Sequence, residues 1–454
     1  MRLTNLILIV SLFTTQILAA AQWKPGDSCP DTIRTLVPGY ADHHGEEQED
    51  RRSFHTMTSV HEALLQCPNI TSLDLRVTLL GCSNWPDRFN FPLSLSGGEK
   101  YANLTQVKLE GYDFAESVWE KVQYKNNPSY HTSRWWPEKL LYWLQSGKAQ
   151  QYLGYRKLDA GQRNKTNLEL WADAMDWERV ETLALKDCRG QEHFMEIMAP
   201  RLRSLKNLEI EDGWSNLGNT TVPFIQALEP DTLHNLAWRE GRKADVLDLI
   251  LRRHGNSLRS LEIRNGEGPR SSTKAFNSAQ LQHLVRSAPK LEHLSINVHR
   301  NVSWPYDVFD TIAEMKELIT LDLWFDILSD CQRQKPEMYT RQYIEWEREM
   351  ENKTFKCSGE ERYQKPLVDD ISALGIFKHI RQKNTSGTVQ KVVFWVGDWS
   401  RSWDGPLYSE SFLEGRRARV VCTPTDKSEG EAWCVVEEGE AYWDSGRRTE
   451  YWMD

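Results

Sequence analysis

The sequence lacks an excess of positive charge. Its 454 residues include 56 Lys and Arg against 65 Asp and Glu, which gives a net charge of −9. Because contacts to phosphates need a basic face, this balance argues against a nucleic-acid-binding protein. No apolar run after residue 21 approaches the ~20 residues of a membrane span, so membrane insertion is not expected. The apolar fraction of 39% and the charged fraction of 27% argue against disorder.

Motifs for catalysis and for cofactors are also missing. The chain contains no GxSxG elbow, HExxH pair, P-loop or GxGxxG turn. His55 and His61 come closest to a metal pair, but a spacing of six puts them on opposite sides of a helix. The sequence therefore predicts no catalytic residue, no cofactor and no metal site.

The eight cysteines include no CxxC pair, which disfavours zinc binding and thioredoxin-like redox chemistry and favours structural disulfides. Cys422 and Cys434 occupy matching positions on either side of a turn-rich linker, as in a hairpin. A second disulfide, between Cys331 and Cys357, would close the insertion around residue 340. A third would join Cys29 to Cys67, each of which is followed by a proline and precedes a predicted strand. The predicted pairs are Cys422–Cys434, Cys331–Cys357 and Cys29–Cys67. For Cys82 and Cys188, only the even total number of cysteines suggests that they pair.

The first 21 residues are typical of a secretory signal peptide. Arg2 is followed by an apolar run at residues 6–13 and three alanines at 19–21, which predicts cleavage before Gln22. An uncleaved membrane anchor is the alternative, but the apolar run is short for one. Glycosylation sequons support an extracellular location, and they lie at Asn69, Asn103, Asn164, Asn219, Asn301, Asn352 and Asn384.

A short segment of the form Leu-x-apolar recurs along the chain, usually after a helix-like segment. The repeated segments are residues 71–77, 105–111, 181–187, 206–212, 234–240, 259–265, 292–298 and 319–325, with a looser ninth at 392–398. Helical spacing of apolar residues precedes several of them, for instance at 246–251 and 281–285. One helix and one short strand cannot bury their own apolar faces, so neighbouring units must stack. The pattern predicts an α/β solenoid with a parallel sheet on one face and helices on the other.

At this point the sequence resembles leucine-rich-repeat proteins, in particular the long irregular repeats of F-box-associated types. More narrowly, it is similar to secreted leucine-rich-repeat-like proteins of filamentous fungi. The segments that carry the resemblance are residues 67–75, 168–185, 198–210, 397–407 and 422–443. The resemblance implies a solenoid fold and an extracellular setting, and it supplies no catalytic residues. No F-box-like segment precedes the repeats, which argues against an intracellular ubiquitin-ligase adapter.

The repeat pattern divides the chain into three parts. We expect a signal peptide at 1–21, a solenoid at 22–387 with insertions at 113–166 and 329–366, and a β-rich cap at 388–454. The cap should contain the disulfide-bonded hairpin, because an open last repeat would expose its core and its strand edge. The first insertion is rich in Trp and Tyr, which could stack on sugar rings or pack against the solenoid.

The strand pattern also predicts a candidate binding surface. The residues between the apolar positions of each strand should point to solvent on the face opposite the helices. Trp324, Arg239 and Arg264 are the large aromatic and Arg side chains among them, and such residues dominate binding surfaces. The sequence thus favours a secreted, non-enzymatic recognition or scaffold protein for a protein or glycan ligand. The alternative is an extracellular enzyme or biosynthetic-pathway accessory that could act on carbohydrate. Its site would lie in the aromatic insertion or in the Asp- and Trp-containing loop 398–404.

Overall fold

A computed structural model describes part of the chain. It covers residues 23–37, 54, 56–77, 93, 95–114, 165–211, 220–239, 246–267, 272–333, 361, 363–397, 418–425 and 432–438. The signal peptide, most of both insertions and the loop 398–404 lie outside these residues, so the expectations about them remain predictions. Within the described residues, no helix has both the length and the apolar character needed to cross a membrane.

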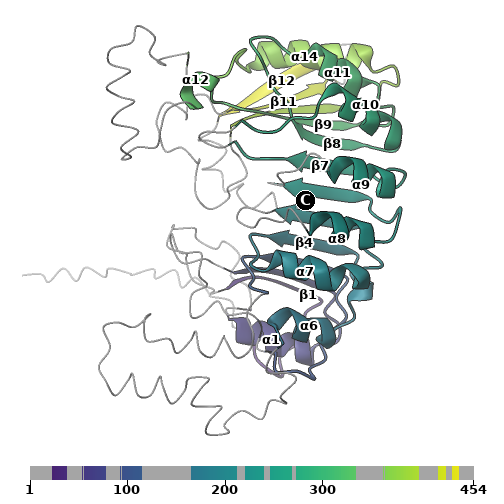
Figure 1. Cartoon of the computed structure of the whole chain (residues 1–454). Coiled ribbons are helices and arrows are strands. Elements are labelled where there is room, and N and C mark those ends of the chain that lie inside the picture. The colour runs from purple at the N-terminus through teal and green to yellow at the C-terminus, as the bar shows by residue number, and fades with distance from the viewer. Residues whose placement is uncertain are drawn as a thin grey trace, which may run out of the picture.

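Twelve strands form one open sheet in which every strand lies beside its neighbour in the chain (Figure 1). Strands β1 to β10 run parallel, whereas β11 and β12 are antiparallel. The strands are β1 (Thr32–Val37), β2 (Ser72–Val77), β3 (Gln106–Glu110), β4 (Thr182–Lys186), β5 (Asn207–Glu211), β6 (Asn235–Arg239), β7 (Ser260–Arg264), β8 (His293–Asn297), β9 (Thr320–Phe325), β10 (Lys391–Val396), β11 (Ala418–Pro424) and β12 (Ala432–Glu438). The predicted α/β class with a mainly parallel sheet is confirmed.

The helices form a second layer along the sheet, from α1 at one end to α14 at the other (Figure 1). The described helices are α1 (Met57–Gln66), α6 (Asn167–Ala174), η2 (Trp177–Arg179), α7 (Gln191–Met198), η3 (Ala199–Arg201), α8 (Thr221–Ala227), α9 (Val246–His254), α10 (Ser278–Ser287), α11 (Tyr306–Ala313), α12 (Asp330–Arg333) and α14 (Asp370–Lys383). Successive helices from α7 to α11 pack side by side, and α14 packs on α11. Each helix therefore follows the strand order beneath it.

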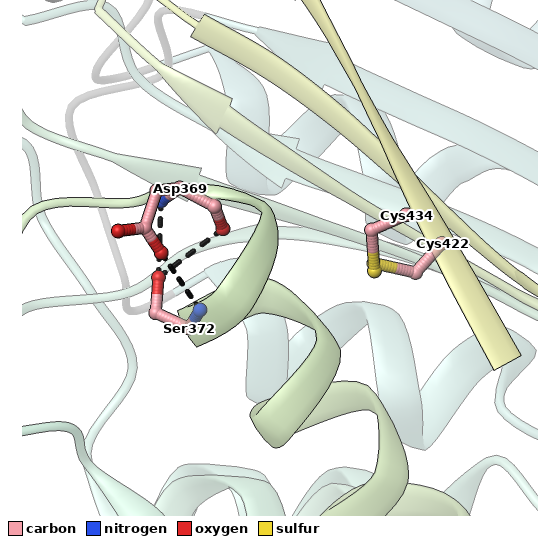
Figure 2. Close-up of a disulfide and its surroundings, with 4 residues drawn as sticks. All are labelled: Asp369, Ser372, Cys422 and Cys434. Carbon is pink, nitrogen blue, oxygen red and sulfur yellow. Dashed lines mark hydrogen bonds between the residues drawn. A yellow bond between two sulfur atoms is a disulfide. The ribbon is translucent and has the colours of Figure 1, made fainter.

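Local sequence explains where several helices begin. A polar side chain before the first turn accepts a hydrogen bond from the backbone N–H three residues on, and the residue there bonds back to the cap. In α14, Ser372 N donates to Asp369 Oδ1 at 2.7 Å, and Asp369 N donates to Ser372 Oγ at 3.0 Å (Figure 2). Thr56, Thr166 and Asn277 start α1, α6 and α10 in the same way.

The core lies between the sheet and the helices. The second and fourth residues of β1 to β10 point toward the helices, and almost all are buried apolar side chains. Leu183, Leu208, Leu236 and Leu261 are adjacent members of one such row, each no more than 2% exposed. Apolar burial of this kind stabilises a fold by about 25 cal/mol per Å².

A ladder of backbone hydrogen bonds runs across the sheet just before the strands begin. The carbonyl of Thr71 accepts bonds from the N–H groups of both Thr105 and Gln106, and the carbonyl of Thr105 accepts from Glu181 and Thr182. The same paired arrangement continues through the carbonyls of Glu181, Lys206, His234, Arg259, Glu292 and Ile319. One close approach along the sheet requires glycine: Gly111 has φ +68°, and a Cβ there would lie 2.4 Å from the Val77 carbonyl oxygen.

The last two strands form the predicted hairpin, and its disulfide is present. Cys422 and Cys434 oppose each other in the β11–β12 register with their Cα atoms 4.1 Å apart, beside α14 (Figure 2). The predicted Cys29–Cys67 bond is also present, with a Cα–Cα distance of 5.3 Å. Strand β10 pairs in parallel with β9, so the parallel run extends past residue 388, where we expected the cap to begin.

The other cysteines differ from the simplest expectation. Cys331 is disulfide-bonded, but its partner lies outside the described residues, so the Cys331–Cys357 pair remains a prediction. Cys188 is free and buried, which makes the suggested pairing with Cys82 wrong. Its thiol donates to the carbonyls of Leu109 and Lys186 at 3.4 Å, and burial raises its pKa. A thiol held in this way is unreactive.

Candidate functional site: the polar face of the sheet

The face of the sheet opposite the helices carries three polar rows. They consist of the first, third and fifth residues of strands β1 to β10, and strand pairing places the members of each row side by side. The first row is Thr32, Ser72, Gln106, Thr182, Asn207, Asn235, Ser260, His293, Thr320 and Lys391. The third row is Arg34, Asp74, Lys108, Ala184, Glu209, Ala237, Glu262, Ser295, Asp322 and Val393. The fifth row is Leu36, Arg76, Glu110, Lys186, Glu211, Arg239, Arg264, Asn297, Trp324 and Trp395.

Charges of opposite sign alternate along the first half of the fifth row. Lys186 Nζ lies 3.8 Å from a carboxylate oxygen of Glu110 and 3.8 Å from one of Glu211. Arg239 Nη1 lies 3.5 Å from a carboxylate oxygen of Glu211, and Arg239 Nε donates to Glu262 Oε1 at 2.7 Å. These side chains are joined across the strands into one network, which satisfies charges that are almost fully buried.

Glu262 is the centre of this network. It accepts hydrogen bonds from Arg239 and, at 2.5 Å, from Arg264 Nε. Burial alone would raise the pKa of the Glu262 carboxyl, but the two guanidinium groups outweigh burial and lower it to about 2. Glu262 is therefore ionised at neutral pH and holds two arginine side chains in fixed positions.

The second half of the fifth row is a stack of cations and indole rings. The Arg264 guanidinium lies 4.1 Å from the ring centre of Trp324, and Trp324 stacks on Trp395 with centres 4.7 Å apart and planes 2° apart. Arg419 of β11 lies 4.8 Å from the ring of Trp395. Each indole N–H is also bonded, Trp324 to Ser295 at 2.9 Å and Trp395 to Asp322 at 2.7 Å. Stacks of this type are stabilising because a cation is attracted to the face of an indole ring.

The three side chains predicted to form an exposed surface lie in this row, and their predicted exposure is wrong. Arg239 is 7% exposed, Arg264 is 2% exposed and Trp324 is 5% exposed. Alternation correctly placed them on the polar face, but ion pairing and ring stacking with neighbouring strands bury them. Both faces of Trp324 are covered by Arg264 and Trp395, so its ring offers no open face to a ligand.

A small hollow lies where β7, β8, β9 and β10 end. Its lining includes Arg264, Asn297, Trp324, Glu267, Thr273 and Asp326, and it has room for about one water molecule. The Asn297 side chain holds the backbone directly after β7 in place. It accepts a hydrogen bond from Asn265 N at 2.7 Å and donates one to Asn265 O at 3.1 Å. The hollow thus brings two of the predicted surface residues together with a carboxylate pair.

That carboxylate pair, Glu267 and Asp326, was not singled out by sequence reasoning. Arg333 Nη2 donates to Glu267 Oε1 at 2.6 Å and to Asp326 Oδ2 at 2.7 Å, so one nitrogen bridges both groups. Glu267 also accepts from the backbone N–H groups of Ile327 at 2.7 Å and Leu328 at 2.8 Å. Glu267 lies about 60 residues before Asp326 and Arg333 in the sequence, and the three carry no local motif, so only the fold brings them together.

The environment of this pair favours a structural role over catalysis. Burial and the neighbouring Asp326 raise the pKa of Glu267 to about 8. The backbone N–H groups and Arg333 lower this pKa, but their effect is smaller. A raised carboxyl pKa inside a hollow is a common feature of catalytic acids. Here, however, both Glu267 oxygens accept hydrogen bonds from the chain itself, which hold the carboxyl group in place. We interpret the cluster as the tie that fixes residues 326–333 to the loop after β7.

The remaining predicted sites are distributed away from this face. Asn69, Asn103 and Asn301 are exposed, whereas Asn384 is 4% exposed and donates through Nδ2 to the carbonyls of Ala313 and Met315 at 3.0 and 2.9 Å. Asn164, Asn219 and Asn352 lie outside the described residues.

His61 bonds to the Tyr101 hydroxyl at 2.5 Å. In the described part of the chain, no group of three or more His, Cys, Asp or Glu side chains is arranged to hold a metal ion.

Comparison with known proteins adds no relative: no family model matches the chain, and neither a curated protein nor a solved structure matches it.

Proposed function

We propose that the chain is a secreted, non-enzymatic recognition protein with an irregular leucine-rich-repeat solenoid, and that it binds a protein ligand on the polar face of its sheet. The strand order that follows the chain, the helices that pack side by side along the sheet and the backbone ladder before the strands support the solenoid. The leader sequence, the sequons and the disulfides support secretion.

The observation that carries the proposal is the graded burial of the polar face. The first-row side chains are half-buried or exposed along all ten strands, and most of the third row is half-buried. The fifth-row side chains are buried from Glu110 of β3 to Trp395 of β10. The face therefore consists of an accessible strip of hydroxyl, amide and charged groups supported by a rigid, buried network. Groups held in fixed positions lose little entropy when a partner binds.

The chemistry of the strip favours a protein ligand over a glycan. No Trp, Tyr or Phe side chain of β1 to β10 is exposed on it, so the strip lacks an aromatic platform on which a sugar ring could stack. Charges of both signs occur in its third row, where Arg34 pairs with Asp74 at 3.4 Å. Mixed charges provide orientation and selectivity toward a complementary protein surface.

An extracellular enzyme or pathway accessory that acts on carbohydrate is the second candidate. The density of Trp and Tyr residues in 113–166 favours it, and its site would lie there or in the loop 398–404. Turnover of a polysaccharide by the mature protein, lost on changing one Asp or Glu in those segments, would establish this candidate in place of the first.

The test is capture of a partner from the native extracellular medium by three forms of the mature protein. The face variant carries Lys108→Glu, Asn235→Arg and Ser260→Arg, and the control carries Arg252→Glu, Gln282→Arg and Glu196→Gln on three helices. Neither set alters the net charge. We expect a protein captured by the wild type and the control but reduced at least tenfold with the face variant. Equal capture by all three forms would contradict a ligand site on this face.

A further inference from the structure

The outer edge of the last strand, β12, differs from the rest of the molecule in its exposed apolar side chains. Trp433 is 52% exposed and Val435 is 39% exposed on one side of the strand, whereas Val436, which pairs with Val420, is 41% exposed on the other side. The other large apolar side chains that are exposed in the described residues are dispersed over separate helices and turns. Exposed large apolar side chains that are concentrated on one strand commonly mark an interaction surface.

The backbone of β12 is also open on that side. The strand pairs with β11 through all seven of its residues, and it is the last strand of the sheet. Among the described strands, none lies against its outer edge. A row of free N–H and C=O groups is a template for another strand, and natural proteins usually block such edges with lysine, proline or a bulge. The strand contains no lysine, proline or bulge, and its charged residues, Glu437 and Glu438, lie at its C-terminal end.

The hairpin geometry fixes which side chains would meet a partner strand. Cys434 bonds to Cys422, which is fully buried in the core, so this side of β12 faces the helix layer. By alternation, Trp433 and Val435 lie on the polar face beside Val421. Helix α14 packs against β11 and β12, and no described strand pairs with the outer edge of β12.

We propose that β12 pairs with β12 of a second copy of this chain, antiparallel and about a two-fold axis at Val435, so that the two sheets become continuous. Val435 is the centre of the seven-residue strand, and full overlap of two copies therefore places it opposite its own equivalent. In that register Cys434 opposes Val436, and Trp433 opposes Glu437 of the second copy. Apolar residues meet at the centre.

Charge selects this arrangement over the parallel one. The two acidic residues, Glu437 and Glu438, lie at one end of the strand. Antiparallel pairing separates the acidic ends of the two copies, whereas parallel pairing would align them and place like charges opposite each other. A self-complementary strip of this kind is what a two-fold interface requires.

The experiment measures the mass of the mature protein by sedimentation velocity between about 1 and 100 µM. We expect a dimer at the upper concentrations, and we expect the amides of residues 432–438 to exchange hydrogen more slowly as the dimer forms. The edge variant Trp433→Lys with Val435→Lys should remain monomeric throughout, with an unchanged circular dichroism spectrum. Both substituted side chains are exposed, so the monomer fold should tolerate the change.

The matched control is Val222→Lys with Ile371→Lys, which makes the same change at two exposed apolar positions away from the edge. The control should dimerise like the wild type. The proposal would be overturned if the wild type were monomeric at 100 µM. It would also be overturned if that monomer instead bound an unrelated extended peptide at β12. A dimer that persists in the edge variant would overturn it equally.

Discussion

At the scale of single residues, Arg239 shows how the polar face is built. It is bonded to Glu262 and Glu209 and lies 3.5 Å from Glu211. Replacing it removes the cation shared by three carboxylates on β5 and β7, the two strands that flank β6. Removing one partner of a buried ion pair costs roughly 3–5 kcal/mol. We predict that Arg239→Ala lowers the free energy of unfolding by about that amount, measured by urea denaturation.

The matched control is Arg203→Ala, because Arg203 pairs with Glu178 at 3.7 Å with both side chains more than half exposed. Exposed pairs of this type contribute about 0–1 kcal/mol. If the two variants lost equal stability, the network would not be the rigid support that the proposed function needs.

A second residue, His254, makes stability depend on pH. It is fully buried, and neither ring nitrogen has a hydrogen-bond partner among the described residues. Burial and the nearby Arg253 lower its pKa from 6.5 to about 4, so the unfolded chain binds a proton more readily between these values. By linkage, stability should fall as the pH drops from about 6.5 to 4.

We predict that His254→Leu flattens this part of the stability curve relative to the wild type, measured by thermal or urea unfolding at several pH values. His293→Gln serves as the control, because His293 is exposed at the start of β8. A wild-type curve whose shape is the same in His254→Leu would show that the buried imidazole does not carry the effect.

At the scale of elements, the hairpin of β11 and β12 depends on its disulfide. The bond closes a loop with a sequence separation of 12 residues, and in the chain-entropy model such a crosslink stabilises by roughly 3 kcal/mol. We predict that the double variant Cys422→Ala with Cys434→Ala unfolds at lower urea concentration and that peptide cleavage by protease begins in β11 and β12. Removing the free thiol with Cys188→Ala should leave protease resistance of the hairpin unchanged, and early cleavage elsewhere would contradict this assignment.

The same elements show how much of the fold the sequence could predict. The Leu-x-apolar segments correspond to β2 through β9, and the hairpin register follows from the positions of its two cysteines. Alternation identifies the face to which a side chain points, but it carries no information about contacts from neighbouring strands. This is why Arg239, Arg264 and Trp324 were placed on the correct face and expected to be exposed. The Glu267–Asp326–Arg333 cluster could not be predicted, because Glu267 follows β7 whereas Asp326 and Arg333 follow β9, and only the fold brings them together.

At the scale of the whole molecule, the proposed secretion predicts a pattern of modification. The mature chain should begin at Gln22 and carry glycans at the exposed Asn69, Asn103 and Asn301. Asn384 should be unmodified in the folded protein, because a glycan would replace an amide hydrogen that bonds to the Ala313 or Met315 carbonyl. Glycopeptide mass spectrometry of the secreted protein measures this occupancy. Full occupancy of Asn384 would contradict the packing of the segment after α14.

The measurement that tests the central claim most directly is amine labelling of the mature protein, alone and in complex with the protein that it captures. Lys108 and Lys391 lie on the polar face, whereas Lys378 is exposed on α14. If the accessible strip binds the ligand, labelling of at least one of the two face lysines should fall severalfold in the complex while labelling of Lys378 stays constant. Loss of labelling at Lys378 with no change at Lys108 and Lys391 would place the ligand on the helical side and contradict the proposed function.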